Sequence, residues 1–177
     1  MTNFDFLTKE HDFDSFSSIA VAAENLLHVD VDSCVLSCRR AMEGAVRWMF
    51  EIDMDLTLPE QDKLGALVAD PAFRRILGEA LWERVDEIRR LGNTAAHEGG
   101  QTTEEEAVRC LEDLYDFMDF MASSYCDDYT PVPFDRSLLE LTPEEALSFV
   151  PGLDPKQFLL GNGILALPPG KDSSEKN

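Results

Sequence analysis

Residues 33–53 read SCVLSCRRAMEGAVRWMFEID, and their apolar side chains recur every three or four positions. This spacing places them on one face of an α-helix, which predicts a long amphipathic helix with one buried side. The predicted buried stripe consists of Cys34, Cys38, Ala41, Met42, Ala45, Trp48, Met49 and Ile52. Glu43 and Arg47 lie four residues apart on the opposite side, where they can form an ion pair in water.

The same spacing extends on both sides of this helix. A first helix is predicted from about residue 15 to 28, with Asp14 as its N-cap. Asp70-Pro71 favours the start of a short helix, and the next long helix is predicted over residues 79–97, ending at the glycines that follow. Thr103-Glu-Glu-Glu106 has the form of a capping box and predicts the start of the last long helix. The fold class is therefore all-α, a bundle of about four main antiparallel helices with short helices and a mostly irregular C-terminal tail.

The character of the sequence changes after Tyr125. Residues 1–126 are predicted to form the helical bundle, and residues 127–177 a Pro- and Gly-rich C-terminal extension. The extension has too many apolar side chains for a free linker, so we expect it to pack on the bundle or on a partner. From about residue 171 we expect disorder.

Composition limits the classes of function. The chain has 177 residues with 15 Lys and Arg against 35 Asp and Glu, a net charge of −20. This charge argues against nucleic-acid binding by a broad basic surface and against an anionic membrane as partner, although a local basic site remains open. No leader and no run approaching ~20 apolar residues is evident, so we expect a cytoplasmic protein with reduced, buried cysteines.

One basic stretch, residues 88–97, carries the groups suited to chemistry. Arg90, Asn93 and His97 are spaced to share one helix face, where a cation, an amide and an imidazole could hold a phosphate and move a proton. Gly92 costs ~1 kcal/mol relative to Ala in a helix, so a neighbouring helix or a ligand should approach closely there. The alternative is structural: Arg90 pairs with Asp86 on the surface, and Asn93 and His97 cap the helix end.

Residues 89–98, RRLGNTAAHE, resemble the signature of a helical domain of unassigned function in the HEPN superfamily. That domain occurs at the N-terminus of type I restriction enzyme R subunits and as stand-alone small proteins. The resemblance spans roughly residues 3–134 and includes the following further segments: residues 3–7 (NFDFL), 22–24 (AAE), 38–43 (CRRAME), Leu58-Pro59 and 125–134.

The resemblance implies a bundle of four or more helices that is often a homodimer. In catalytic HEPN proteins, an Arg-polar-x-x-x-His motif forms a metal-independent ribonuclease site, in which His transfers protons and Arg stabilises phosphate charge. Asn93 and His97 match the polar and His positions. Gly92 stands where the motif has Arg, and Arg90 and Arg89 are the nearest cations.

Three functions remain open. The first is an interaction, assembly or regulatory module of a nucleic-acid-handling defence system, with restriction or defence subunits as partners. The second is a HEPN-type endoribonuclease with Arg90, Asn93 and His97 as catalytic residues and Arg89 and Gly92 contributing to binding. The third is an acidic DNA mimic. No nucleotide-binding glycine loop and no set of metal ligands stands out in the sequence, so neither a cofactor nor a metal is expected.

Overall fold

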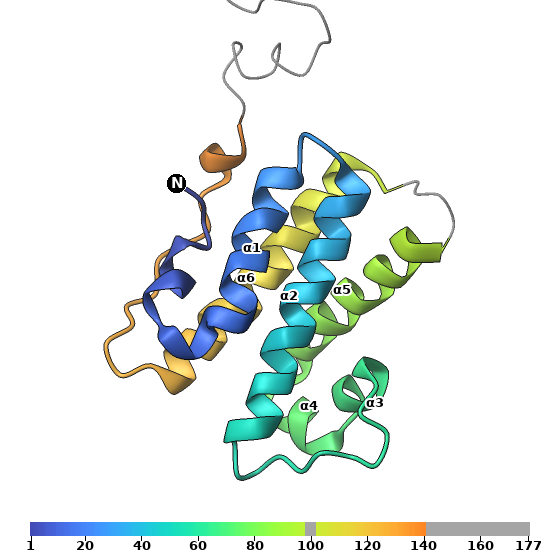
Figure 1. The fold of residues 1–177 in the computed structure, drawn as a ribbon, viewed down its shortest axis with the longest axis vertical. Coiled ribbons are helices and arrows are strands. Elements are labelled where there is room, and N and C mark those ends of the chain that lie inside the picture. The colour runs from blue at the N-terminus through green and yellow to red at the C-terminus, as the bar shows by residue number, and fades with distance from the viewer. Residues whose placement is uncertain (98–101, 141–177) are drawn as a thin grey trace, which may run out of the picture. The chain divides into compact units, whose positions relative to one another are not determined.

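Long helices that alternate in direction dominate the computed structural model, which describes residues 1–97 and 102–140 (Figure 1). The four long helices are α1 (Asp14–Leu26), α2 (Val31–Ile52), α5 (Glu79–His97) and α6 (Glu104–Tyr125). Within those described ranges there is no strand, which confirms the predicted all-α class. None of the helices there has the length and apolar character needed to cross a membrane.

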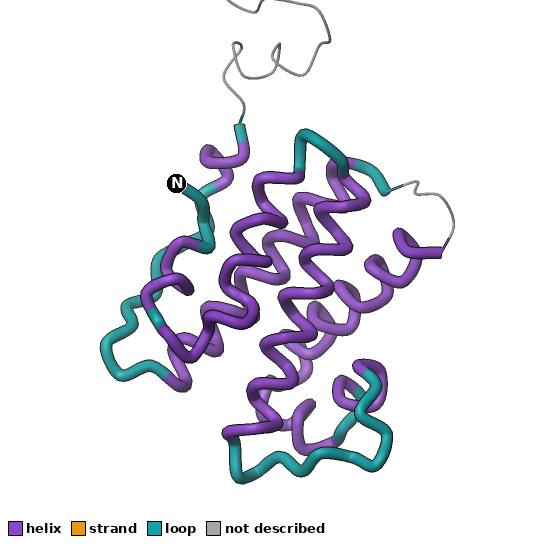
Figure 2. The backbone as a smooth tube through the Cα atoms, in the orientation of Figure 1, coloured by secondary structure: helices purple, strands orange, loops and turns teal. Residues whose placement is uncertain are grey.

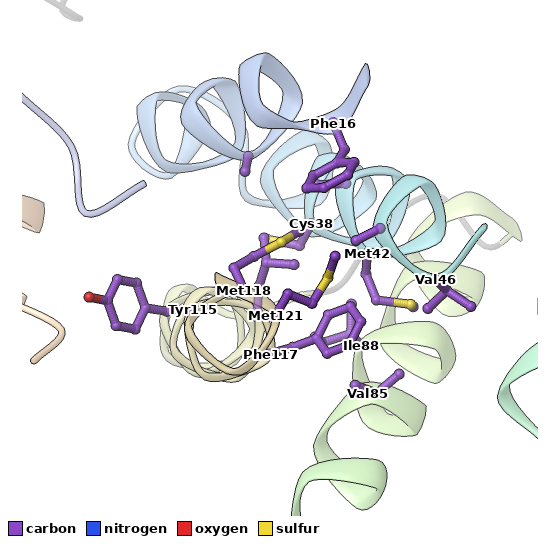
Figure 3. Packing of buried hydrophobic residues seen from close by; sticks show 14 of the residues in the cluster. Phe16, Cys38, Met42, Val46, Val85, Ile88, Tyr115, Phe117, Met118 and Met121 are labelled. Carbon is purple, nitrogen blue, oxygen red and sulfur yellow. The ribbon is translucent and has the colours of Figure 1, made fainter. Parts of the chain in front are cut away.

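Helix α2 packs against α1, α5 and α6 and so carries the centre of the core. Its apolar stripe meets the stripes of α5 and α6, and Figure 3 shows Cys38 and Met42 of α2 beside Met118 and Met121 of α6. The cysteines are free thiols, and burial raises the pKa of the Cys38 thiol well above its ordinary value. Of the stripe predicted for α2, Trp48 is only partly buried, and Ile52 is 46% exposed because the helix ends at that residue.

Capping side chains fix where several helices begin. Asp30 caps α2 by accepting hydrogen bonds from the amides of Asp32 and Ser33. The predicted caps at Asp70 and Thr103 are confirmed, the second as a full capping box. The predicted cap at Asp14 is wrong: Asp14 is already the first residue of α1, because a preceding 3-10 turn leads directly into the helix.

Short elements complete the bundle (Figure 2). They are η1 (Asp5–Lys9), η2 (His11–Phe13), α3 (Leu64–Val68), α4 (Pro71–Leu77) and η3 (Arg136–Leu139). Helices α3 and α4 follow a loop at the end of α2 and contact α5. The structure therefore places a loop and a short helix against the junction of α2 and α5.

Part of the predicted C-terminal extension contacts the bundle. The Tyr129 hydroxyl donates to Asp119 of α6 at 2.6 Å, and the Leu139 carbonyl lies 2.6 Å from the Nε2 of His28. The extension beyond residue 140, the disorder expected from about residue 171 and the glycine stop after residue 97 lie outside the described residues.

Candidate functional site

A pocket opens where α2, the start of α3 and α5 meet. Its volume is about 330 Å³. The lining residues are Arg39, Glu43, Arg47, Lys63, Leu64, Gly65, Arg89 and Asn93. We call it the basic pocket, because four of these side chains are cations and one is an acid.

The close approach of α2 to α5 depends on Gly92. A Cβ atom added to this buried glycine would lie 2.6 Å from the Cβ of Arg39 and 2.9 Å from its Cγ. Any other residue would therefore collide with the aliphatic stem of Arg39. The sequence predicted that a neighbouring helix or a ligand approaches Gly92 closely. In the structure this close neighbour is Arg39 of α2.

Helix α2 contributes three side chains at a spacing of four residues. Arg39, Glu43 and Arg47 consequently lie along one side of the helix. Arg47 donates to Glu43 at 3.0 Å and lies 3.6 Å from Asp62 of the following loop. Its charge is thus largely balanced by neighbouring carboxylates.

Helix α5 contributes Arg89 and Asn93, which are also four residues apart. The Nε of Arg89 donates to Asp86 at 2.8 Å, and this ion pair holds the guanidinium in place. Asn93 brings an amide, which can donate to an anion as well as accept. Lys63, the residue directly before α3, supplies the third wall.

Two of the four cations keep their charge uncompensated. Among the described residues, Arg39 and Lys63 form no ion pair, whereas Arg47 and Arg89 do. The Nε atom of Arg39 is also buried with no hydrogen-bond partner in the described part of the chain. A buried donor left unpaired costs about 1–3 kcal/mol. An anionic ligand in the pocket would compensate the charges of Arg39 and Lys63.

The structure separates the residues that the sequence analysis grouped together. Asn93, Arg89 and Gly92 lie at the basic pocket, as lining or as the contact that builds it. Arg90 is 61% exposed at its side chain and pairs with Asp86 at 3.2 Å and Glu87 at 2.9 Å. The backbone of His97 belongs to the last turn of α5, and its side chain lies outside the described part of the structure.

Arg90 instead lines a second pocket, between α5 and α6. Arg84, Arg109 and Asp113 line it too, along with further acids. Burial raises the pKa of Asp113 to about 6, although Arg84 and Arg109 attract its ionised form. This pocket mixes both signs of charge, so it does not favour an anion.

The sequence alone did not identify three of the pocket residues, Arg39, Arg47 and Lys63. A partial signal was present, since Arg39, Glu43 and Arg47 follow a four-residue spacing and Gly92 marks a close contact. Which helix supplies that contact is a tertiary property, and the spacing does not specify it. Across the described residues, no group of three or more potential ligands is placed to hold a metal ion.

Comparison with protein families identifies a match over the helical bundle. Residues 21–123, more than half of the chain, match the family described as Domain of unknown function (DUF4145). The matched region contains every residue of the basic pocket. No curated protein and no solved structure matches the chain significantly.

Proposed function

The chain belongs to the DUF4145 family, and on that premise we propose that it is an interaction module that binds phosphate groups of a nucleic-acid strand through the basic pocket. The observation that carries this proposal is the gathering of Arg39, Arg47, Lys63 and Arg89 around one pocket in a chain of net charge −20. Arginine and lysine are the side chains that neutralise backbone phosphates.

The composition of the pocket favours phosphate recognition over base recognition. Its lining, taken from residues 39–93 of the described chain, contains no aromatic side chain on which a base could stack. Arginine and asparagine can donate several hydrogen bonds to phosphate oxygens. We therefore infer binding with little dependence on base sequence.

The acidic surface restricts the form of the ligand. A long duplex would bring many phosphates close to the acidic helix faces, where like charges repel. A pocket of about 330 Å³ also has room for only a small part of a strand. A short single strand or a strand end is therefore the ligand that we propose.

The biological setting follows from the resemblance of residues 89–98. We propose that the bundle is HEPN-like, that it acts as an assembly or regulatory module of a defence system of the type I restriction kind, and that it works as a cytoplasmic homodimer. What supports this setting is the similarity of that stretch to the helical domain of the R subunits. The presence of Arg89, Gly92 and Asn93 at one pocket gives the stretch a physical role.

The test measures binding of a short fluorescent single-stranded RNA by anisotropy at several salt concentrations, with the matching DNA strand and duplex as further ligands. Lys63→Gln should weaken binding to either single strand and should reduce the salt slope by about one, because one phosphate contact is lost. Arg89→Gln should act in the same direction but less, since Arg89 already shares its charge with Asp86.

Arg90→Gln is the matched control. It removes the same charge one residue away, from a side chain that lines the other pocket. Equal losses of affinity in Arg89→Gln and Arg90→Gln would mean that the basic pocket is not the site. Absence of single-strand binding at low salt would contradict the proposed function itself.

A second candidate function is the metal-independent endoribonuclease. One observation favours it: Asn93, the polar residue of the HEPN-like motif, lines the basic pocket. Expression of the wild type and of His97→Ala, followed by sequencing of RNA ends that carry 2′,3′-cyclic phosphate, separates the two functions. Cleavage by the wild type alone would establish the nuclease. Intact RNA with both folded proteins would favour the binding module.

A further inference from the structure

A pocket larger than the basic pocket lies on another part of the molecule and is lined mainly by acidic side chains. It is enclosed by η1, by residues 128–138 and by Tyr115 of α6, and its volume is about 640 Å³. We call it the acidic pocket. It shares no lining residue with the basic pocket, so an inference drawn from it is independent of the proposed function.

A hydrogen-bonded clasp joins the two segments that enclose this pocket. The Asn3 side chain accepts a hydrogen bond from the Asp135 amide at 2.7 Å and donates one to the Asp135 carbonyl at 3.1 Å. The backbone N–H of Asn3 donates to both carboxylate oxygens of the buried Glu24, at 3.0 and 3.1 Å. Segments more than 120 residues apart in the chain are thus held in a fixed relation, and the pocket is preformed.

Aromatic rings form the apolar part of the lining. The rings of Phe6 and Tyr129 have centroids 5.1 Å apart and planes tilted by 34°. Tyr115 packs edge-on against Phe6 at 5.6 Å, and its hydroxyl donates to the Val132 carbonyl. Tyr129 is fixed by its hydrogen bond to Asp119. Phe6 and Tyr129 are both partly exposed, so they can contact a ligand.

Carboxylates dominate the charged part of the lining. Four acids, Asp5, Glu10, Asp128 and Asp135, line the pocket, whereas its cations are the Lys9 side chain and the amino group of Met1. Hydrogen bonds from Thr2 and from Ser137 lower the pKa of Asp5 and of Asp135, which keeps both ionised at neutral pH. Glu10 and Asp128 form no ion pair with any described residue, so they remain able to bind a cation.

We propose that the acidic pocket binds an arginine or lysine side chain of a protein partner. Aromatic faces attract cations, most often guanidinium groups, and carboxylates accept charge-assisted hydrogen bonds from them. The pocket combines both features, and its negative charge complements a basic partner.

The dimensions and the rim favour a side chain on a polypeptide over a small free amine. The volume falls in the range of ligand pockets and exceeds what one ammonium group fills, leaving room for the alkyl stem and neighbouring residues. Val132, at the rim, is 62% exposed and offers apolar surface to the flanking residues of such a partner. With this pocket and the basic pocket, one bundle would hold a strand and a protein at separate sites.

The experiment titrates the full chain with the end-blocked peptide Gly-Gly-Arg-Gly-Gly and follows amide and aromatic signals by NMR. The expected result is saturable shifts at Phe6 and Tyr129. The double variant Glu10→Gln with Asp128→Asn should weaken binding about tenfold, because two charge-assisted contacts are lost. Phe6→Leu should weaken it independently of charge. The same peptide with lysine should bind, and with citrulline it should not.

The matched control is the double variant Glu60→Gln with Asp127→Asn. It removes the same total charge from exposed acids that do not line the pocket, and one of them is adjacent to Asp128. Equal weakening in both double variants would show only general attraction to an acidic protein and would overturn the proposal. Shifts confined to another surface, or binding of citrulline and arginine peptides alike, would overturn it too.

Discussion

The basic pocket and the acidic pocket differ in how each gains its charge. The acidic pocket has the sign of the whole chain, which carries −20, and four acids line it. The basic pocket opposes that sign, and it gathers cations from α2, α5 and the residue before α3. The net charge of the chain therefore predicts an acidic pocket, but it does not predict the basic pocket. A local site is set by which elements meet, and not by the average composition.

The largest expected effect is a loss of stability on disrupting the contact between α2 and α5 beside the basic pocket. Gly92→Ala should lower the free energy of unfolding by about 2 kcal/mol, because overpacking against the Arg39 stem costs more than the ~1 kcal/mol gained in helix propensity. Chemical denaturation monitored by circular dichroism measures this change.

Gly65→Ala is the matched control for that substitution. No atom lies within 4 Å of a Cβ added at Gly65, so its stability should stay the same or rise slightly. A Gly92→Ala protein as stable as the wild type would mean that the close contact between α2 and α5 does not limit packing.

The pocket between α5 and α6 differs from both the basic and the acidic pocket, because cationic and acidic side chains line it together. Burial raises the pKa of Asp113 from 3.8 to about 6, so the folded chain holds this proton more tightly than the unfolded chain. The contribution of Asp113 to stability is full below pH 4 and is lost as the pH rises through 6. Asp113→Asn should therefore be more stable than the wild type at pH 8, by no more than the about 3 kcal/mol that a shift of about two pKa units represents, and equal to it near pH 4.

Parallel denaturation series of the wild type and Asp113→Asn from pH 4 to pH 8 test this prediction. The difference between the two proteins isolates Asp113 from the other carboxylates, several of which have lowered pKa values and change stability in the opposite direction. A difference that does not vary with pH would show that the Asp113 carboxyl titrates normally.

A smaller loss of stability is expected when the clasp beside the acidic pocket is removed. Asn3→Ala removes both hydrogen bonds of the clasp to Asp135 and should cost about 1 kcal/mol, because these groups are partly accessible to water. Hydrogen exchange at the Asp135 amide should accelerate, and the arginine peptide should bind more weakly. Asn25→Ala, an exposed change on α1, serves as the control, and equal exchange rates in both variants would contradict the role of the clasp.

The smallest expected effect concerns Arg90. Its side chain is 61% exposed and its ion pairs lie at the surface, where such pairs contribute little. Arg90→Gln should change the free energy of unfolding by less than about 0.5 kcal/mol in a denaturant titration. A loss above about 1.5 kcal/mol would assign Arg90 a structural role that its exposure does not suggest.

Local patterns in the sequence predicted the helices well. The apolar spacing predicted a helix over residues 79–97, and α5 covers these residues. The caps at Asp70 and Thr103 act through neighbouring amides that the sequence specifies. The two 3-10 helices before α1 were not predicted, because such short turns carry no clear apolar period. Because η2 leads directly into α1, Asp14 lies inside the helix and does not cap it.

The candidate site could be predicted only in part. Arg89 and Asn93 are four residues apart on one helix, so sequence spacing places them near each other. Lys63 and Arg39 join them only through the meeting of three elements, which no local pattern encodes. Conversely, Arg90 follows Arg89 in the sequence, but it forms ion pairs with Asp86 and Glu87 and lines a different pocket.

Phosphate binding in the basic pocket can be observed directly. Titration of the ¹⁵N-labelled protein with a 5′-phosphorylated dinucleotide, followed through the arginine Nε–Hε and asparagine side-chain signals, reports each candidate donor separately. We expect saturable shifts of the Arg39 Nε–Hε and Asn93 side-chain signals, with the Arg90 signal unchanged. Shifts at Arg90 with Arg39 and Asn93 unchanged would contradict this expectation and would move the phosphate site to the other side of α5.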